Sequence, residues 1–294
     1  MKHAILGAGA IGGLMATALG AIGEDVTLVV RQEKLANYPQ LLSLERPAST
    51  ITATAHAVSR LTEPVDVLWI ATKAYHLEPA LETIETAPGA VVPLLNGVDH
   101  VAVLRARFGH DRVLPATIAV EAERLADGRF VQRTMVRLAV AASGQPVLGT
   151  VLSRLQDDLG FACQFVENEQ TLLWSKLCFL APFALITSAS GKNRGEIFAD
   201  PEWKAKLYSA VAEAAAVAKA SGAEVEAAKI EKIFDALPES MRSSMFKDLI
   251  AGRRLELDAI AGPIVRGGAQ YGIAVPTTEA LVKAIEARAD SWQL

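Results

Sequence analysis

The chain has 294 residues, a formal net charge of −4 and 51% hydrophobic residues. This length predicts about two domains, each with enough apolar residues for a sizeable core. The slightly acidic balance, without a basic block, argues against a nucleic-acid partner. Only Cys163 and Cys178 are present, both in apolar segments, which argues against a disulfide framework and favours a reducing, cytoplasmic location. No signal-peptide pattern and no uninterrupted apolar run of transmembrane length occur, so we expect no membrane partner.

The first predicted elements form a dinucleotide-binding βαβ unit. An apolar run that ends at Leu6 enters a glycine-rich turn, and a second apolar run ends at Arg31. The turn reads Gly7, Ala8, Gly9, Ala10, Ile11, Gly12. Its glycines are expected to make the turn, to let the backbone approach a pyrophosphate, and to let the helix pack on the sheet. The alternative is an ordinary strand-to-helix turn that needs small residues.

Arg31 occupies the position where the cofactor's ribose would lie. An Asp or Glu that would bind a ribose 2′-hydroxyl is absent there. A guanidinium favours a 2′-phosphate, so the sequence predicts NADP(H) as the cofactor. The alternative is a solvated surface charge at a strand end.

Further strands are predicted over residues 66–71, 91–95 and 113–120, because each is a short apolar run bounded by Gly, Pro or Asp. Residues 128–142 alternate more, and Asp127-Gly128 can turn a hairpin. We therefore expect a doubly wound, Rossmann-type sheet that is finished by antiparallel strands.

The pattern becomes helical after about residue 167, with Gly and Pro punctuation at plausible helix ends. The expected helices cover residues 170–188, 201–221, 225–237, 243–251, 255–271 and 277–289. The predicted fold is α/β, with an NADP-binding domain over residues 1–167 and an all-α substrate domain over residues 168–294.

Four polar residues lie at the edges of these elements: Lys73 and Asn96 each follow a strand, Lys176 lies in an apolar helix, and Glu256 begins a helix. Ligands of doubly wound sheets bind at the carboxyl ends of strands, so Lys73 and Asn96 should face the cofactor. The five histidines show no metal-ligand spacing, and we expect no metal site.

Together these features resemble the ketopantoate reductase (2-dehydropantoate 2-reductase) family. The matching residues span nearly the whole chain in the family's order: Gly7–Gly12, Arg31, Lys73-Ala74, Asn96-Gly97, Trp174–Leu177, Gly195-Glu196, Ser243–Met245 with Asp248, Glu256–Asp258 and Tyr271–Pro276. The resemblance implies NADPH-dependent reduction of a 2-oxo acid to a 2-hydroxy acid, most simply ketopantoate to pantoate. That reaction belongs to pantothenate biosynthesis.

The resemblance also implies roles for individual residues. Lys176 matches the catalytic lysine and Glu256 its partner carboxylate, and both contact substrate. Ser244 matches a ligand of the substrate carboxylate, and Asn96 a residue that contacts both cofactor and substrate. Arg31 and Lys73 match groups that hold the adenosine phosphate, beside the glycine-rich turn.

The chemistry of Lys176 agrees with this role. Hydride addition to a ketone builds negative charge on its oxygen, and an ammonium can stabilise that charge and supply the proton. Leucines and a phenylalanine around Lys176 should lower its pKa by desolvation, whereas Glu256 should oppose that change. The alternatives are that Lys176 extends to water and that Glu256 merely favours the helix dipole.

The chain departs from the family where the substrate's polar groups would bind. Leu180 and Ala184, one and two turns beyond Lys176, replace asparagines, and Arg194 replaces a third. A more apolar substrate is one explanation. Compensating donors form the second: Thr187, Ser188, Ser190 and Asn193. The third is a register changed by Pro182. Arg194 either recruits an anionic substrate group or is a solvated loop cation.

Two rival functions remain open in the sequence. A 3-hydroxyacid-type dehydrogenase also has a nucleotide domain and a catalytic lysine, but its lysine is followed by asparagine at the fourth position, where this chain has Leu180. A sensor that binds NADP(H) without turnover is the second rival. The oligomeric state is also open, with a homodimer as a candidate.

Overall fold

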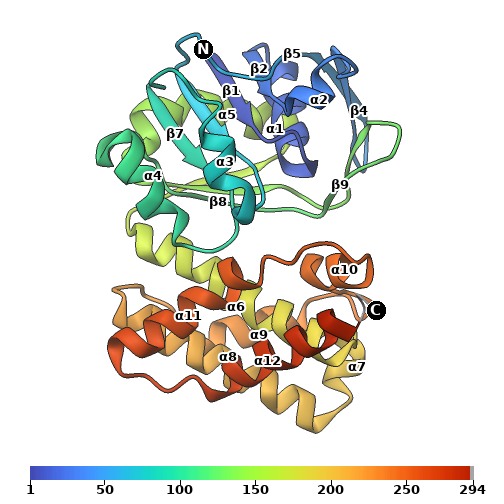
Figure 1. Ribbon diagram of the computed structural model, residues 1–294, viewed down its shortest axis with the longest axis vertical. Coiled ribbons are helices and arrows are strands. Elements are labelled where there is room, and N and C mark those ends of the chain that lie inside the picture. Colours follow the sequence, from blue (N-terminus) through green and yellow to red (C-terminus); the bar gives the residue numbers. More distant parts are fainter. Residues whose placement is uncertain (292–294) are drawn as a thin grey trace. The chain divides into compact units, whose positions relative to one another are not determined.

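The computed structural model describes residues 1–291 and separates into two compact units (Figure 1). The N-terminal unit comprises Met1–Leu95 and His100–Glu167. The helical unit comprises Asn96–Asp99 together with the chain from Asn168 onward. The short segment Asn96–Asp99, which the sequence places in the first domain, therefore packs with the helices.

The N-terminal unit is built on a five-stranded parallel sheet with the order β5-β2-β1-β6-β7. Its strands are β1 Lys2–Leu6, β2 Asp25–Val29, β5 His56–Val58, β6 Val67–Ile70 and β7 Ala90–Pro93. Strands β6 and β7 are buried throughout, which explains their continuous apolar sequences. The sheet confirms the predicted Rossmann-type architecture.

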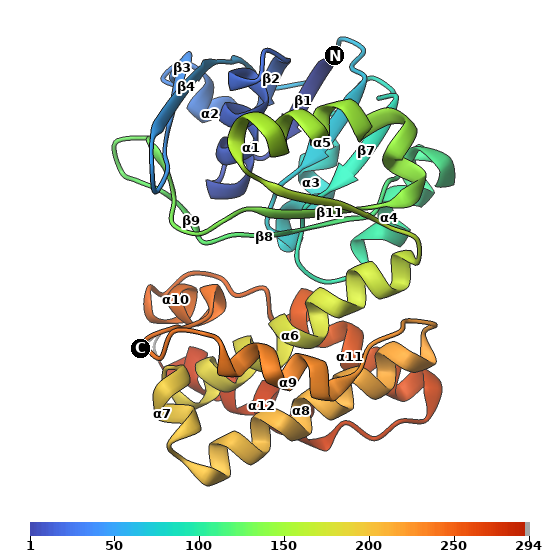
Figure 2. The ribbon, with the colours of Figure 1, turned by 180° about the vertical axis from the view of Figure 1, so that it is seen from behind.

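Helices cover both faces of this sheet. They are α1 Ala10–Ala21, α2 Gln32–Leu35, α3 Leu77–Leu81, α4 His100–Phe108 and α5 Gln145–Leu159. Helix α3 lies in front of the sheet in Figure 1, whereas α5 lies in front when the molecule is turned by 180° in Figure 2. The 3₁₀ turns are η1 Ala74–His76, η2 His110–Arg112 and η3 Ala142–Gly144.

Two smaller sheets complete the N-terminal unit. One has the order β4-β3-β10-β9 and packs against α1; the other has the order β12-β11-β8. The strands are β3 Leu41–Glu45, β4 Thr50–Thr54, β8 Ala116–Ala119, β9 Ala122–Arg124, β10 Phe130–Gln132, β11 Arg137–Ala141 and β12 Ala162–Val166. Strands β9 and β10 are antiparallel, so the predicted hairpin at Asp127-Gly128 is confirmed.

The strand predicted over 113–120 is confirmed as β8, which is shorter and pairs antiparallel with β11, while an isolated bridge joins Val113 to Val91. The sequence does not predict strands β3, β4 and β5. Strand β4, Thr-Ile-Thr-Ala-Thr, is mostly exposed, and such a mixed segment carries little of the apolar signal that identifies buried strands.

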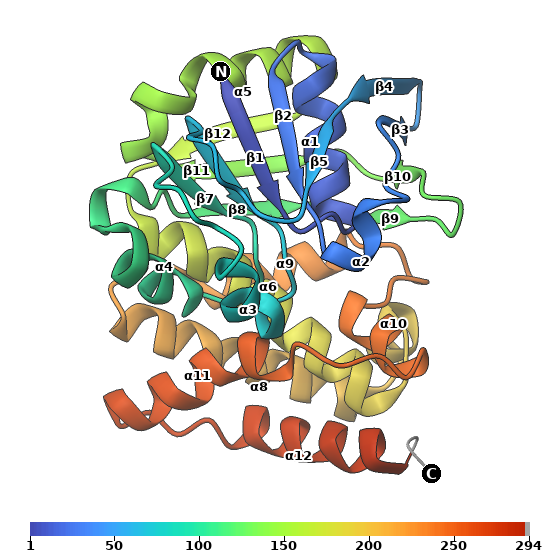
Figure 3. The ribbon, with the colours of Figure 1, turned by 45° about the horizontal axis from the view of Figure 1, so that its top comes forward.

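The helical unit surrounds one long helix, α6. Its helices are α6 Glu169–Ser190, α7 Arg194–Phe198, α8 Pro201–Ala220, α9 Ala227–Asp235, α10 Ser244–Ile250, α11 Leu257–Tyr271 and α12 Pro276–Ser291 (Figure 3). Helix α6 contacts α8, α9, α10, α11 and α12. Asn168 begins it by accepting a hydrogen bond from the Thr171 N–H at 2.9 Å.

Helix α6 is long and strongly apolar. Within residues 1–291 it is the one helix long and apolar enough to cross a membrane, judged by length and composition alone. However, 72% of the most apolar 18-residue stretch of this helix is buried inside the protein, as is typical of a central core helix. Pro182 does not interrupt it, so residues after Lys176 keep regular helical spacing.

Candidate functional site

The glycine-rich turn joins β1 to α1 and each glycine meets a different requirement. Gly7 has φ of +101°, which an L side chain rarely adopts. A Cβ atom on Gly12 would overlap the carbonyl oxygen of Gly7, whereas a Cβ on Gly9 would meet no atom within 4 Å. The turn is therefore tight at Gly7 and Gly12 and open at Gly9, where a ligand's pyrophosphate requires space.

The start of α1 is suited to bind an anion. Gly9 is its N-cap, no side chain caps it, and no acidic residue lies in its first turn. The first N–H groups of a helix have no partner within it, and they form the positive end of the helix dipole. With the open space at Gly9, these residues fit a dinucleotide. Ala8, Ala10 and Ile11 provide the remaining backbone of this turn.

Arg31 and Lys73 follow strands of the parallel sheet, as predicted. Arg31 is the N-cap of α2, and its side chain is 74% exposed and 3.7 Å from a carboxylate oxygen of Glu33. Lys73 begins the 3₁₀ turn η1 directly after the β6 strand. Both residues come from the carboxyl ends of strands, where ligands of such sheets bind, and their roles toward the cofactor remain predictions.

Lys176, Asn96 and Glu256 meet in the helical unit. The Lys176 ammonium donates a hydrogen bond to Asn96 Oδ1 at 3.1 Å, and Asn96 Nδ2 donates to Glu256 Oε2 at 3.3 Å. Lys176 is partly buried and Glu256 is 6% exposed. One amide thus connects an ammonium with a buried carboxylate, although the three residues lie far apart in the sequence.

The segment 96–99 brings Asn96 to this position. Gly97 has φ of +86°, and a Cβ atom there would overlap the carbonyl oxygen of Ala259. Arg266 on α11 donates to Asp99 at 2.5 Å and to Asp258 at 2.6 Å. The glycine therefore permits close packing on α11, and the ion pair between Arg266 and Asp99 holds the segment to the helix that Glu256 begins. Sequence analysis missed Arg266, because only the folded chain brings it to Asp99.

The pKa of Lys176 is lowered to about 8, first because burial disfavours its charged form. The charge of Glu256 acts in the opposite direction and raises the pKa. These are the two opposing effects that the sequence predicts. A lysine with this pKa holds its proton at neutral pH and can still release it, as a general acid must.

The side chains beyond Lys176 on α6 differ in accessibility. Phe179 and Leu180, one turn beyond it, are partly buried, whereas Ala184 is 0% exposed and packs in the core. Since α6 is regular through Pro182, a changed register does not explain the departures. Leu180 can present apolar surface near the lysine, and the predicted substrate contact of Ala184 has no accessible surface to support it.

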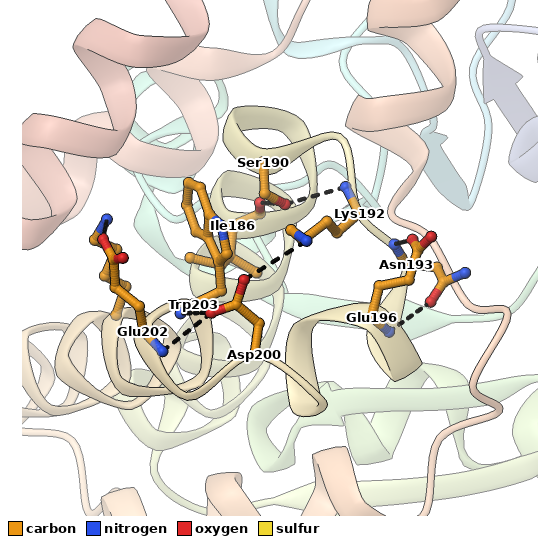
Figure 4. A network of polar contacts seen from close by, with 9 residues as sticks. Ile186, Ser190, Lys192, Asn193, Glu196, Asp200, Glu202 and Trp203 are labelled. Atoms are coloured by element: carbon orange, nitrogen blue, oxygen red, sulfur yellow. Dashed lines mark hydrogen bonds and ion pairs between the residues drawn. The ribbon is translucent and has the colours of Figure 1, made fainter.

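Three of the four polar side chains proposed as compensating donors have other partners. Thr187 Oγ1 lies 2.7 Å from Ser243 Oγ, and Ser190 Oγ donates to the Ile186 carbonyl at 2.6 Å. Figure 4 shows Ser190 and the capping box in which Asn193 and Glu196 bind each other's backbone N–H groups. Ser188 is 0% exposed and its hydroxyl has no hydrogen-bond partner in the described part of the chain. Three of the proposed donors are therefore already used within the protein, and the fourth has no accessible surface.

Arg194 binds backbone carbonyls, and Ser244 lies at the start of α10. Arg194 donates to the carbonyls of Phe234 and Asp235 at 2.9 and 3.0 Å, and its guanidinium lies over the ring of Phe198. It therefore caps the end of α9 and is not a solvated loop cation. Two of its five N–H donors are used in this way, and its contact with an anionic substrate group stays a prediction. Ser243, rather than Ser244, caps α10. Ser244 is exposed at the first position of that helix, and its substrate role stays a prediction.

Neither cysteine is a candidate nucleophile. Burial raises the pKa of Cys163 to about 11 and that of Cys178 to about 12, so both stay thiols at neutral pH. Among the described residues no group of three or more His, Cys, Asp or Glu side chains is arranged to hold a metal ion.

The profile of the family described as ketopantoate reductase PanE/ApbA matches residues 3–145, and that of its C-terminal domain matches residues 168–289. The chain belongs to the ketopantoate reductase family. The 2-dehydropantoate 2-reductase of Caulobacter vibrioides is 30% identical over 97% of this chain and 98% of its own length. The enzyme of that name from Vibrio cholerae is 28% identical over 99% of both chains.

Solved structures show the same fold. A ketopantoate reductase of the family from Ralstonia eutropha JMP134 superposes with a TM-score of 0.88 over 100% of both chains, at 24% identity. A D-mandelate dehydrogenase with NADH and anilino(oxo)acetate also gives 0.88 over 100% of both chains, at 23% identity. Membership of the ketopantoate reductase family makes this protein an NADP-dependent oxidoreductase that acts on CH–OH groups, of the 2-oxo acid reductase type.

Proposed function

We propose that this protein uses NADPH to reduce 2-dehydropantoate, or a close and more apolar 2-oxo acid, to the 2-hydroxy acid. The observation that carries the proposal is the linkage from Lys176 through Asn96 to the buried Glu256. It provides a proton donor with a pKa of about 8 in a chain whose glycine-rich turn fits a dinucleotide. A sensor without turnover needs no such donor.

In the reaction the bound nicotinamide supplies the hydride. Lys176 points its ammonium at the ketone oxygen, stabilises the developing negative charge and donates the proton. Asn96 fixes the direction of that ammonium, and Glu256 opposes the loss of charge that burial favours. Ser244 is the proposed ligand of the substrate carboxylate.

The preference for NADPH over NADH is proposed for Arg31. Its side chain is 74% exposed, and Arg31 lies two residues after the end of β2. No acidic residue occupies that position to bind a 2′-hydroxyl. Arg31→Ala should remove most of the preference. Lys34→Ala, a loss of charge three residues away in α2, should leave it unchanged.

The substrate preference is proposed for Leu180. A buried substrate hydroxyl without a partner costs about 1–3 kcal/mol, and Phe179 and Leu180 offer only carbon near the lysine. Apolar surfaces reject an added hydroxyl only modestly, so 2-dehydropantoate should still react. We expect 2-oxo acids with aliphatic tails to react at least as well.

An assay of NADPH oxidation with a panel of 2-oxo acids tests the proposal. Turnover of 2-dehydropantoate and of its analogue without the 4-hydroxyl supports it. A 3-oxo acid as the only substrate would instead favour the 3-hydroxyacid-type dehydrogenase, and nucleotide binding without turnover of any acid would favour the sensor. A preference of a hundredfold or more for 2-dehydropantoate over that analogue would contradict the apolar pocket but would leave the proposed reaction intact.

A homodimer is the oligomeric state that we propose. A structural neighbour with a TM-score of 0.81 and 18% identity is described as a dimeric ketopantoate reductase from Staphylococcus aureus. Light scattering coupled to size-exclusion chromatography measures the mass of this protein in solution. A monomer mass would contradict the proposal.

A further inference from the structure

Arg124, at the end of β9, reaches the glycine-rich turn from a distant part of the sequence. Its Nη1 donates a hydrogen bond to the carbonyl oxygen of Ala8 at 3.1 Å. Ala8 lies between Gly7 and Gly9, the two glycines that shape the turn for a pyrophosphate. One of the five N–H donors of the guanidinium is thus used on the turn itself.

Aromatic rings hold the guanidinium in this place. Its central carbon lies 5.3 Å from the ring centre of Tyr38 and 5.7 Å from that of Phe130. The Phe130 ring packs so closely on α1 that a Cβ atom at Gly13 would overlap it. The same hairpin therefore contacts the first turns of α1 and holds the cation of Arg124 beside them, which reduces the entropy lost when it binds a ligand.

The charge of Arg124 is not neutralised by the protein. Arg133, on the same hairpin, is 2.9 Å from Glu123, and Arg129 is 2.8 Å from Asp127. Over the described residues 1–291, Arg124 takes part in no ion pair. An arginine that is oriented by stacking and carries an unpaired charge beside an anion-binding turn has the chemistry of a phosphate ligand.

We propose that Arg124 binds the pyrophosphate of the dinucleotide and provides the cationic part of this binding site. The inference rests on the proposed use of a nicotinamide nucleotide. It assigns Arg124 to the pyrophosphate, which NADPH and NADH share, because the residue contacts the turn at Ala8. Arg31, after β2, is assigned to the 2′-phosphate that only NADPH has.

Calorimetric titration of the protein with NADPH and with NADH tests this assignment. Arg124→Gln should weaken both nucleotides by a similar factor of about tenfold or more, since charge-assisted hydrogen bonds to phosphate are among the stronger ones. Arg124→Lys should bind both nucleotides more tightly than Arg124→Gln does, because lysine keeps the positive charge and loses only the bidentate hydrogen bonds and the ring stacking of the guanidinium. Arg133→Gln removes the same charge from the same hairpin and should bind both nucleotides as the unmutated protein does.

Several results would overturn the assignment. Affinities within twofold of the unmutated protein would show that Arg124 does not contact the phosphates, and a loss for NADPH alone would place it at the 2′-phosphate. Equal losses in Arg124→Gln and Arg124→Lys would show that the residue only braces the turn. If the unmutated protein bound neither nucleotide, the proposed function would fail first.

Discussion

Glu256→Gln should change the pH dependence of the reaction rather than only its rate. The carboxylate raises the pKa of Lys176 against the effect of burial, and a neutral amide of the same shape removes this effect. The pKa of Lys176 should therefore fall below its present value of about 8. Lys176 must be protonated to donate in the reducing direction, so reduction should decline at a lower pH than in the unmutated enzyme.

The size of the effect follows from the geometry. The hydrogen bonds of 3.1 and 3.3 Å share the one amide of Asn96. Such a bridge separates ammonium and carboxylate by about 7 Å, where an effective dielectric constant of about 20 gives about 2.4 kcal/mol, or about 1.7 pH units. Partial exposure of Lys176 reduces this, and we expect the decline to move by about 1 pH unit.

The measurement is kcat against pH in both directions of the reaction. In the reducing direction the unmutated rate should fall as pH rises through about 8. In the oxidising direction Lys176 must be neutral to accept the proton, so that rate should rise over the same range. Both midpoints should move to lower pH in Glu256→Gln.

Asp258→Asn is the matched control for this experiment. Its side chain is 84% exposed, pairs with Arg266, and does not contribute to the pKa of Lys176. A variant Glu256→Gln that loses rate equally at every pH, without a moved midpoint, would refute the electrostatic role. If the midpoint moved equally in Asp258→Asn, the electrostatic effect on Lys176 could not be assigned to Glu256.

Three further outcomes test other parts of the site. Lys176→Ala should lower kcat at least about 100-fold while NADPH affinity by calorimetry stays unchanged, and near-normal kcat would contradict the lysine mechanism. Gly97→Ala should lower the unfolding temperature and kcat more than Gly222→Ala does. Both glycines have positive φ, +86° and +91°, but of these two only Gly97 lies against another backbone segment. Equal effects of the two substitutions would show that this close packing is unimportant. Leu180→Asn should raise kcat/KM for 2-dehydropantoate relative to its analogue without the 4-hydroxyl, and an unchanged ratio would remove Leu180 from the pocket.

The sequence predicts best where one local requirement decides the structure. Gly7 and Gly12 follow from the geometry of a single turn, and the turn has that geometry. The buried strands β6 and β7 follow from continuous apolar sequences. The pKa of Lys176 follows from burial in its apolar helix, which lowers it, and from the Glu256 carboxylate, which opposes that change. Each of these depends on neighbours in the chain or on a family pattern that names the distant partner.

The sequence predicts less well where the partner is distant and no pattern names it. Helical spacing correctly places Leu180 and Ala184 near the Lys176 face of α6, but it cannot show that neighbouring helices bury Ala184 completely. It also cannot show that the end of α9 uses the guanidinium of Arg194. Arg194 and Arg124 both donate to backbone carbonyls and both lie over aromatic rings. They differ in position: Arg194 lies at the end of α9, whereas Arg124 lies beside the start of α1, whose first N–H groups suit a phosphate. What an arginine can bind therefore depends on the groups that the fold places beside it, and the local sequence does not show those groups.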